Sequence, residues 1–121
     1  MTKSSNFSRP EDSEAKADVR FLKGLELFNK GEFFECHDVI EELWLETPSE
    51  DKWRDLYKGV IQAAAAIYQH DRGIPSGAKG LLRTSLGYLK KYEPFALGLN
   101  VGKMVKDMEK GFETKPRLEY E

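Results

Sequence analysis

Apolar side chains recur every three to four residues through most of this chain, and no stretch alternates apolar and polar residues as a half-buried strand would. A repeat of this length places apolar side chains along one face of a helix, and other helices must then cover that face. The pattern therefore predicts an all-α fold. With 121 residues, the chain is long enough for one hydrophobic core and hence for one domain.

Residues that typically begin and end helices divide this pattern into about five helices. Gly31 and Gly73 indicate sharp corners, Thr47 is a candidate N-cap, and Asn100 is placed to cap the last helix. The expected helices cover about 11–29, 32–46 and 48–72, then a fourth segment from the break at 73–76 to about 92, and finally 101–111. We expect residues 1–10 to be a flexible N-terminal tail, 11–111 a single helical domain, and 112–121 a flexible C-terminal tail.

The middle of the chain resembles itself after a shift of 42 residues, which places Gly31 on Gly73 and Cys36 on Ala78. Each copy then consists of a helix, a glycine corner and a returning helix, as in tetratricopeptide repeats. We therefore expect two packed antiparallel αα-hairpins plus a C-terminal helix. The run Ala63–Ala66 favours a central position for the third helix, because alanines allow neighbours to approach closely from every side.

Composition narrows the classes of partner. Lys and Arg number 19 against 21 Asp and Glu, so the net charge of −2 speaks against nucleic acid and against an anionic membrane surface. No apolar stretch approaches the ~20 residues of a membrane span, and no secretory signal is visible. The single Cys36 cannot form an internal disulfide, which favours the cytoplasm, and we interpret it as a buried small residue rather than a nucleophile.

The second expected helix carries the strongest signal for a functional site. At 100° per residue, His37, Glu41 and Trp44 share the apolar face, whereas the other glutamates of this helix lie on the opposite side. An ionisable group on a face that points to the core is costly unless it is paired. We therefore expect His37 to be largely buried and hydrogen-bonded to Glu41 or to the third helix.

The segment Phe33–Trp44 resembles the HxxxExxW signature of a family of small bacterial and archaeal helical proteins known as domain of unknown function 309. The resemblance extends from about Phe21 to Leu89. It includes Gly59–Ala65, similar to the family's GxIQxAA segment, and the residues Gly73, Gly77, Ala78, Leu81 and Leu82, similar to its GNxxGAxxLL segment.

This resemblance implies a helical fold and a candidate metal site at His37 and Glu41. The family pattern also has a histidine seven residues after the glutamine that corresponds to Gln62. Here that place is Gln69, and the histidine follows one residue later as His70. We therefore regard His70 as a weaker candidate ligand than His37.

Two classes of function remain open. The first, which we favour, is a binding or scaffold module with a polar cluster in a helical groove, formed by the candidate site residues His37, Glu41, Trp44 and Gln62. Its partner would be a protein, a peptide, a small ligand or a second copy of the chain. The alternative is a metal-binding protein or metal-dependent hydrolase that holds a divalent metal through His37 and Glu41. A hydrogen-bonded structural cluster is favoured over a metal, because the chain has only two His and one Cys. No substrate follows from the sequence.

Overall fold

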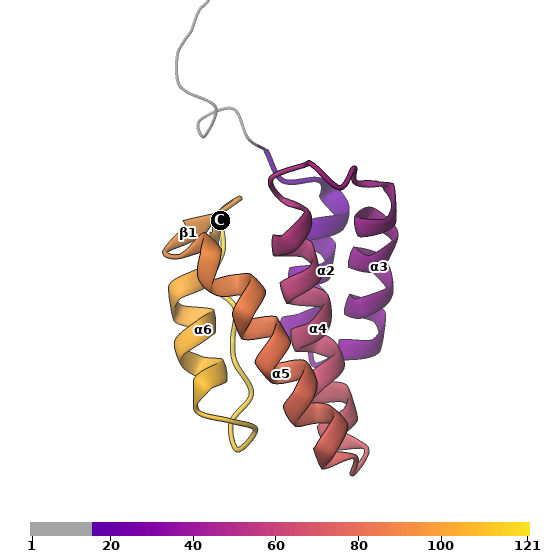
Figure 1. Cartoon of the computed structure of the whole chain (residues 1–121), viewed down its shortest axis with the longest axis vertical. Coiled ribbons are helices and arrows are strands. Elements are labelled where there is room, and N and C mark those ends of the chain that lie inside the picture. Colours follow the sequence, from indigo (N-terminus) through magenta and orange to yellow (C-terminus); the bar gives the residue numbers. More distant parts are fainter. Residues whose placement is uncertain (1–15) are drawn as a thin grey trace, which may run out of the picture.

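The computed structural model describes residues 16–121, and this part of the chain contains five α-helices (Figure 1). They are α2 (Val19–Asn29), α3 (Phe33–Glu46), α4 (Arg54–Asp71), α5 (Pro75–Leu89) and α6 (Val101–Glu109). A short 3-10 helix, η2 (Lys90–Tyr92), extends α5, and two strands of two residues each, β1 (Phe95–Ala96) and β2 (Leu99–Asn100), precede α6. The predicted all-α class is confirmed. The expected tail at 1–10 and the expected helical residues 11–15 lie outside the described residues.

Helices α2 and α3 form one hairpin and α4 and α5 form the other, and their corners have the same geometry. Gly31 and Gly73 have φ of +80° and +78°, a left-handed conformation that glycine adopts without strain. In each corner the residue after the glycine donates its N–H to the carbonyl five residues before it. These bonds are Glu32 N to Leu27 O at 2.9 Å and Ile74 N to Gln69 O at 3.0 Å. The predicted pair of hairpins is therefore confirmed.

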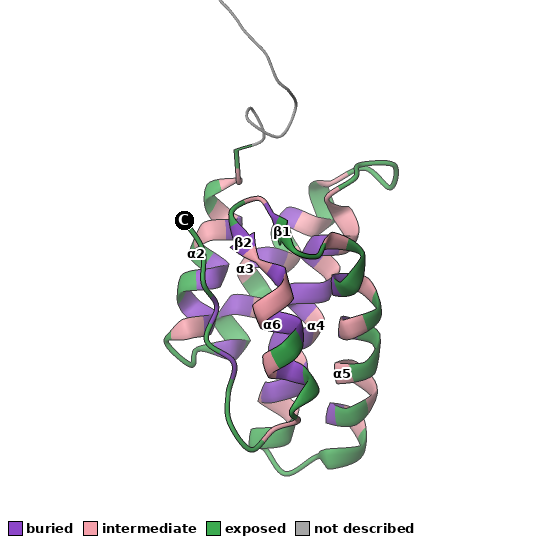
Figure 2. Cartoon of the chain, turned by 90° about the vertical axis from the view of Figure 1, so that its left-hand side faces the viewer, coloured by how far each residue is buried: buried purple, intermediate pink, exposed green. Residues whose placement is uncertain are grey.

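Helix α4 occupies the centre of the bundle, since it packs against both α3 and α5 (Figure 1). Ala63, Ala64 and Ala66 are buried, as expected for a helix that is enclosed on several sides (Figure 2). Helix α5 approaches α4 closely at Gly59, where an added Cβ would lie 2.7 Å from Leu89 Cδ2. The hydroxyl of Ser85 donates to the carbonyl of Gly59 at 2.7 Å and closes this contact.

Helix α4 begins at Arg54, six residues later than the sequence predicts. The expected N-cap, Thr47, instead donates its hydroxyl to the carbonyl of Leu43 at 2.7 Å and so completes the end of α3. The chain turns at Asp51, whose carboxylate accepts the N–H of Trp53 at 2.8 Å. The capping pattern was correctly recognised as a helix boundary, but the hydroxyl serves the helix before it.

Helix α2 begins at Val19, and the described residues before it are not helical. The carboxylate of Asp18 accepts the backbone N–H of Arg20 at 2.8 Å, so Asp18 is the N-cap. Hydrogen bonds from the Arg20 side chain and then from its backbone lower the pKa of Asp18 below the ordinary value. The expected start near residue 11 is therefore too early, because apolar spacing alone does not reveal this cap.

The β1–β2 hairpin is a feature that the sequence analysis did not predict. Its strands are antiparallel, and the turn between them uses positive φ at Leu97 (48°) and Gly98 (81°), which suits a two-residue hairpin turn. Asn100, at the end of β2, accepts the N–H of Lys103 at 3.0 Å and caps α6, as predicted. With two residues each, the strands are too short to show an alternation of apolar and polar residues in the sequence.

Residues 112–121, which we name the C-terminal strap, pack on the domain rather than forming the expected flexible tail (Figure 2). The carboxamide of Asn29 donates to Leu118 O at 2.9 Å and accepts from Leu118 N at 2.7 Å. Further along, Asn100 N donates to Glu119 O at 2.8 Å. Leu118 itself is only 3% exposed. The sequence did not predict the strap, because its few apolar residues show no helical spacing.

Among residues 16–121, no helix combines the length and apolar character needed to cross a membrane.

Candidate functional site

Helices α3 and α4 bring one polar stripe from each helix to a shared surface. The stripe on α3 contains His37, Glu41 and Trp44, and the stripe on α4 contains Arg54, Lys58 and Gln62 at intervals of four residues. The two stripes meet, because Trp44 contacts the cations of α4 and His37 lines a cavity with Ala65. We call these six residues the α3/α4 face.

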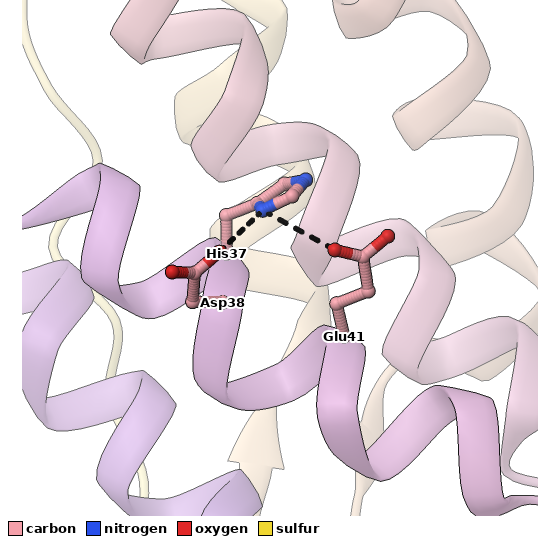
Figure 3. Close-up of side chains that lie close together, drawn as sticks. All are labelled: His37, Asp38 and Glu41. Carbon is pink, nitrogen blue, oxygen red and sulfur yellow. Dashed lines mark ion pairs between the residues drawn. The ribbon is translucent and has the colours of Figure 1, made fainter.

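His37 lies between two carboxylates of its own helix (Figure 3). Its Nδ1 is 3.6 Å from Asp38 Oδ1 and 3.8 Å from Glu41 Oε1, distances that are too long for hydrogen bonds. The His37 side chain is 30% exposed, and its Nδ1 is shielded without a hydrogen bond among the described residues, so the expected bond to Glu41 or to the third helix is absent. Helix α4 contributes Ala65, Tyr68 and Gln69 to the cavity beside His37, and Nδ1 bonds to none of them.

His37, Asp38 and Glu41 each offer one ligand atom, and these atoms lie within 4.8 Å of one another. Imidazole and carboxylate groups are ordinary ligands of zinc and manganese, which could lie between these three groups. Sequence reasoning missed Asp38, because adjacent helical residues point about 100° apart and only the side-chain torsions bring its carboxylate towards His37.

The structure does not place His70 in this group of described residues. Its ring stacks on Phe112, with 4.4 Å between ring centroids, and its Nδ1 is 3.7 Å from Asp71 Oδ1. Gln69, which stands where the family pattern has a histidine, instead lines the cavity beside His37. This cavity of about 170 Å³ is bounded by Phe33, Phe34, His37, Ala65, Tyr68 and Gln69.

Trp44 is half-buried and contacts two cations of α4. Arg54 Cζ lies 4.2 Å and Lys58 Nζ 4.1 Å from the Trp44 ring centroid, within the usual range for cation–π contacts. The sequence analysis did not include these two cations among the candidate site residues. Their spacing of four residues ahead of Gln62 was the one signal that could have revealed them.

Three side-chain atoms on the α3/α4 face are shielded from solvent and have no hydrogen-bond partner within the described part of the chain. They are His37 Nδ1, Arg54 Nε and Gln62 Oε1. The expected hydrogen-bonded cluster of His37, Glu41 and Gln62 is therefore absent from the described residues. Buried polar atoms in folded proteins nearly always have partners, so three exceptions on one face require an explanation.

Cys36 lies next to His37 in the sequence but points into the core, where it is 0% exposed. Burial raises the pKa of its thiol to about 12. The thiol is therefore neutral at physiological pH, which fits a buried small residue rather than a nucleophile.

The fold and this face define a class: a small all-α protein of two αα-hairpins whose inner helices share a polar, partly buried surface. The chain belongs to the family described as Domain of unknown function (DUF309), whose sequence profile matches residues 21–81. The candidate residues His37, Glu41, Trp44 and Gln62 all lie within that range.

Two relatives resemble the chain beyond the matched region. The uncharacterized protein YpuF of Bacillus subtilis is 34% identical over 100 residues, which are 81% of this chain and 56% of YpuF. An uncharacterized protein of Aquifex aeolicus is 26% identical over 98 residues, which are 77% of this chain and 29% of that protein. The chain thus spans about half of one relative and less than a third of the other.

Proposed function

We propose that this protein is a ligand-binding module and that its binding site is the α3/α4 face. The observation that supports this proposal is that three buried polar atoms without a hydrogen-bond partner among the described residues, His37 Nδ1, Arg54 Nε and Gln62 Oε1, all belong to the α3/α4 face. Each unsatisfied polar group costs about 1–3 kcal/mol, so a chain selected only for stability would replace them. A small polar ligand that bonds to them would remove this cost.

Gln62→Met tests whether the α3/α4 face sacrifices stability for binding. Methionine is similar in size but has no strong acceptor, so the free energy of unfolding, measured in urea, should rise by about 1 kcal/mol. Gln69→Met is the matched control on the same helix, and it should bring no gain because the Gln69 carboxamide is not among the unpartnered groups. A loss of stability in Gln62→Met would instead indicate a structural role for Gln62.

Binding itself can be tested by ¹H–¹⁵N NMR with a broad library of small polar compounds. Compounds that bind should shift amide signals of α3 and α4 around the α3/α4 face. Gln62→Met should weaken their binding, while Lys79→Met, at an exposed position of α5, should not. Shifts that gather elsewhere on the domain, or a library without any compound that reaches this face, would contradict the proposal.

A divalent metal ion bound by His37, Asp38 and Glu41 is a second candidate function. The observation in its favour is that three ligand atoms lie within 4.8 Å of one another while His37 Nδ1 has no hydrogen bond. The Asp38 and Glu41 side chains are 60% and 41% exposed, so a metal held here would keep coordination positions open to solvent. Open positions are typical of catalytic rather than structural metal sites, which keeps a hydrolase within this second candidate.

Calorimetric titration with zinc and manganese tests this second candidate. If the three residues are ligands, His37→Gln and Glu41→Gln should abolish stoichiometric binding, and metal should raise the melting temperature of the unmodified protein. Glu42→Gln is the matched control, because Glu42 is an exposed acid on the same helix outside the group. Equal losses in Glu41→Gln and Glu42→Gln would show nonspecific attraction to an acidic helix and would exclude the site.

We also infer that the module works in the cytoplasm. The inference depends on the single Cys36, which is buried and has no cysteine with which to form an internal disulfide. Localisation of a fluorescent fusion in the source cell would test it, and a signal outside the cytoplasm would contradict it.

A further inference from the structure

Arg54 and Lys58 place two positive charges beside one tryptophan. They lie one turn apart on α4, and their charged groups are 4.2 and 4.1 Å from the Trp44 ring centroid. Like charges at this spacing repel each other and destabilise a helix. The contact with Trp44 holds both long side chains in place despite this repulsion.

No carboxylate within the described residues forms an ion pair with Arg54 or Lys58. Of the acids near these cations, Asp55 pairs with Lys91 and Asp51 accepts the N–H of Trp53, while Glu41 on the same face lies 3.8 Å from His37 Nδ1. Arg54 Nε is also shielded from solvent without a hydrogen bond.

We propose that Arg54 and Lys58 bind the phosphoryl group of a small ligand beside Trp44. The inference rests on the proposed function and names the chemistry of the ligand at one end of the α3/α4 face. A guanidinium donates two parallel hydrogen bonds to an oxyanion, and a lysine adds a compact charge, so the pair suits a dianion better than a monoanion. Arg54 is the first residue of the 18-residue helix α4, and the positive end of that helix adds to the attraction.

The free ion and a phosphate ester share this chemistry, and titrations can distinguish them. We would titrate the protein at low ionic strength with inorganic phosphate, phenyl phosphate and benzoate, following the Trp44 indole N–H and the Arg54 Nε–H by NMR. Phosphate and phenyl phosphate should shift both signals, and benzoate should bind about tenfold or more weakly because it carries one charge. Tighter binding of phenyl phosphate than of phosphate would identify an ester as the ligand, and equal binding would identify the free ion.

Variants then assign the binding to these two residues. Arg54→Gln and Lys58→Gln should each weaken phosphate binding about tenfold or more, and Arg54→Lys should fall between Arg54→Gln and the unmodified protein because it keeps the charge but loses the paired donors. Lys52→Gln is the matched control, since Lys52 Nζ lies 4.8 Å from the Trp53 ring centroid as a single cation beside a single tryptophan. Urea unfolding would verify that each variant is folded.

Two results would overturn the inference: no phosphate-dependent shift at Trp44, or an equal loss of binding in Lys52→Gln and Lys58→Gln. Either result would leave the proposed function intact if neutral compounds still bound at His37 and Gln62. If no compound reached the α3/α4 face at all, the proposed function itself would fail.

Discussion

Replacing Leu118 with alanine should lower the free energy of unfolding by about 3 kcal/mol, because the leucine is 3% exposed and its removal leaves a cavity beneath the C-terminal strap. The measurement is urea or thermal unfolding of the full chain. Arg117→Ala is the matched control, since Arg117 is exposed and its backbone carbonyl, which the substitution keeps, accepts the hydrogen bond from Lys103 Nζ. Its expected loss is below about 0.5 kcal/mol.

Equal and small losses in the two variants would show that the strap does not contribute to stability. The flexible tail expected from the sequence would then be the better description of residues 112–121. Asn29→Ala extends the test, because it removes both hydrogen bonds to the backbone of Leu118 without changing the strap itself.

The thiol of Cys36 should react with Ellman's reagent about a thousandfold more slowly in the native protein than in the unfolded chain. The side chain is fully buried and burial raises the pKa of the thiol to about 12, so reaction requires a transient opening of the bundle. The rate at pH 8, with and without urea, is the measurement. A fast native reaction would place the thiol at the surface and would restore Cys36 as a candidate nucleophile.

The raised pKa of Cys36 also predicts a dependence of stability on pH. The unfolded thiol loses its proton near the ordinary pKa of 9.0, while the folded thiol keeps it until about pH 12. The contribution of this group is therefore fully present below pH 9 and is lost as the pH rises towards 12. Tyr57, whose pKa burial also raises to about 12, should act in the same direction.

The fold could be predicted from the sequence wherever the signal was local. Gly31 and Gly73 needed only their own backbone conformation to form corners, and Asn100 needed only the neighbouring Lys103 N–H to form a cap. The start of α4 and the strap could not be predicted in this way. The Thr47 hydroxyl could donate to a carbonyl at the end of one helix or accept an N–H at the start of the next, and spacing does not decide between them. Leu118 is held by Asn29, a residue that no sequence pattern connects to it.

The candidate site, too, could be predicted from the sequence only where the signal was local. Helical spacing correctly placed His37, Glu41 and Trp44 on one face of α3, because that depends only on 100° per residue. It could not predict which atoms of α4 lie opposite, since that depends on the register between two helices. The contacts of Arg54 and Lys58 with Trp44 depend on this register. The expected bond between His37 and Glu41 is absent because of the side-chain torsions within α3, which spacing does not give either.

The hydrogen bonds between Asn29 and Leu118 connect residues 89 positions apart, whereas each hairpin closes through a corner of a few residues. Chain segments close to each other in sequence meet quickly, while distant ones must first lose much more chain entropy. The two hairpins should therefore fold early and the strap should dock last. During synthesis, α3 and α4 also leave the ribosome before Leu118 does. The α3/α4 face can thus be in place before synthesis reaches the strap, whose Leu118 bonds to Asn29 at the end of α2.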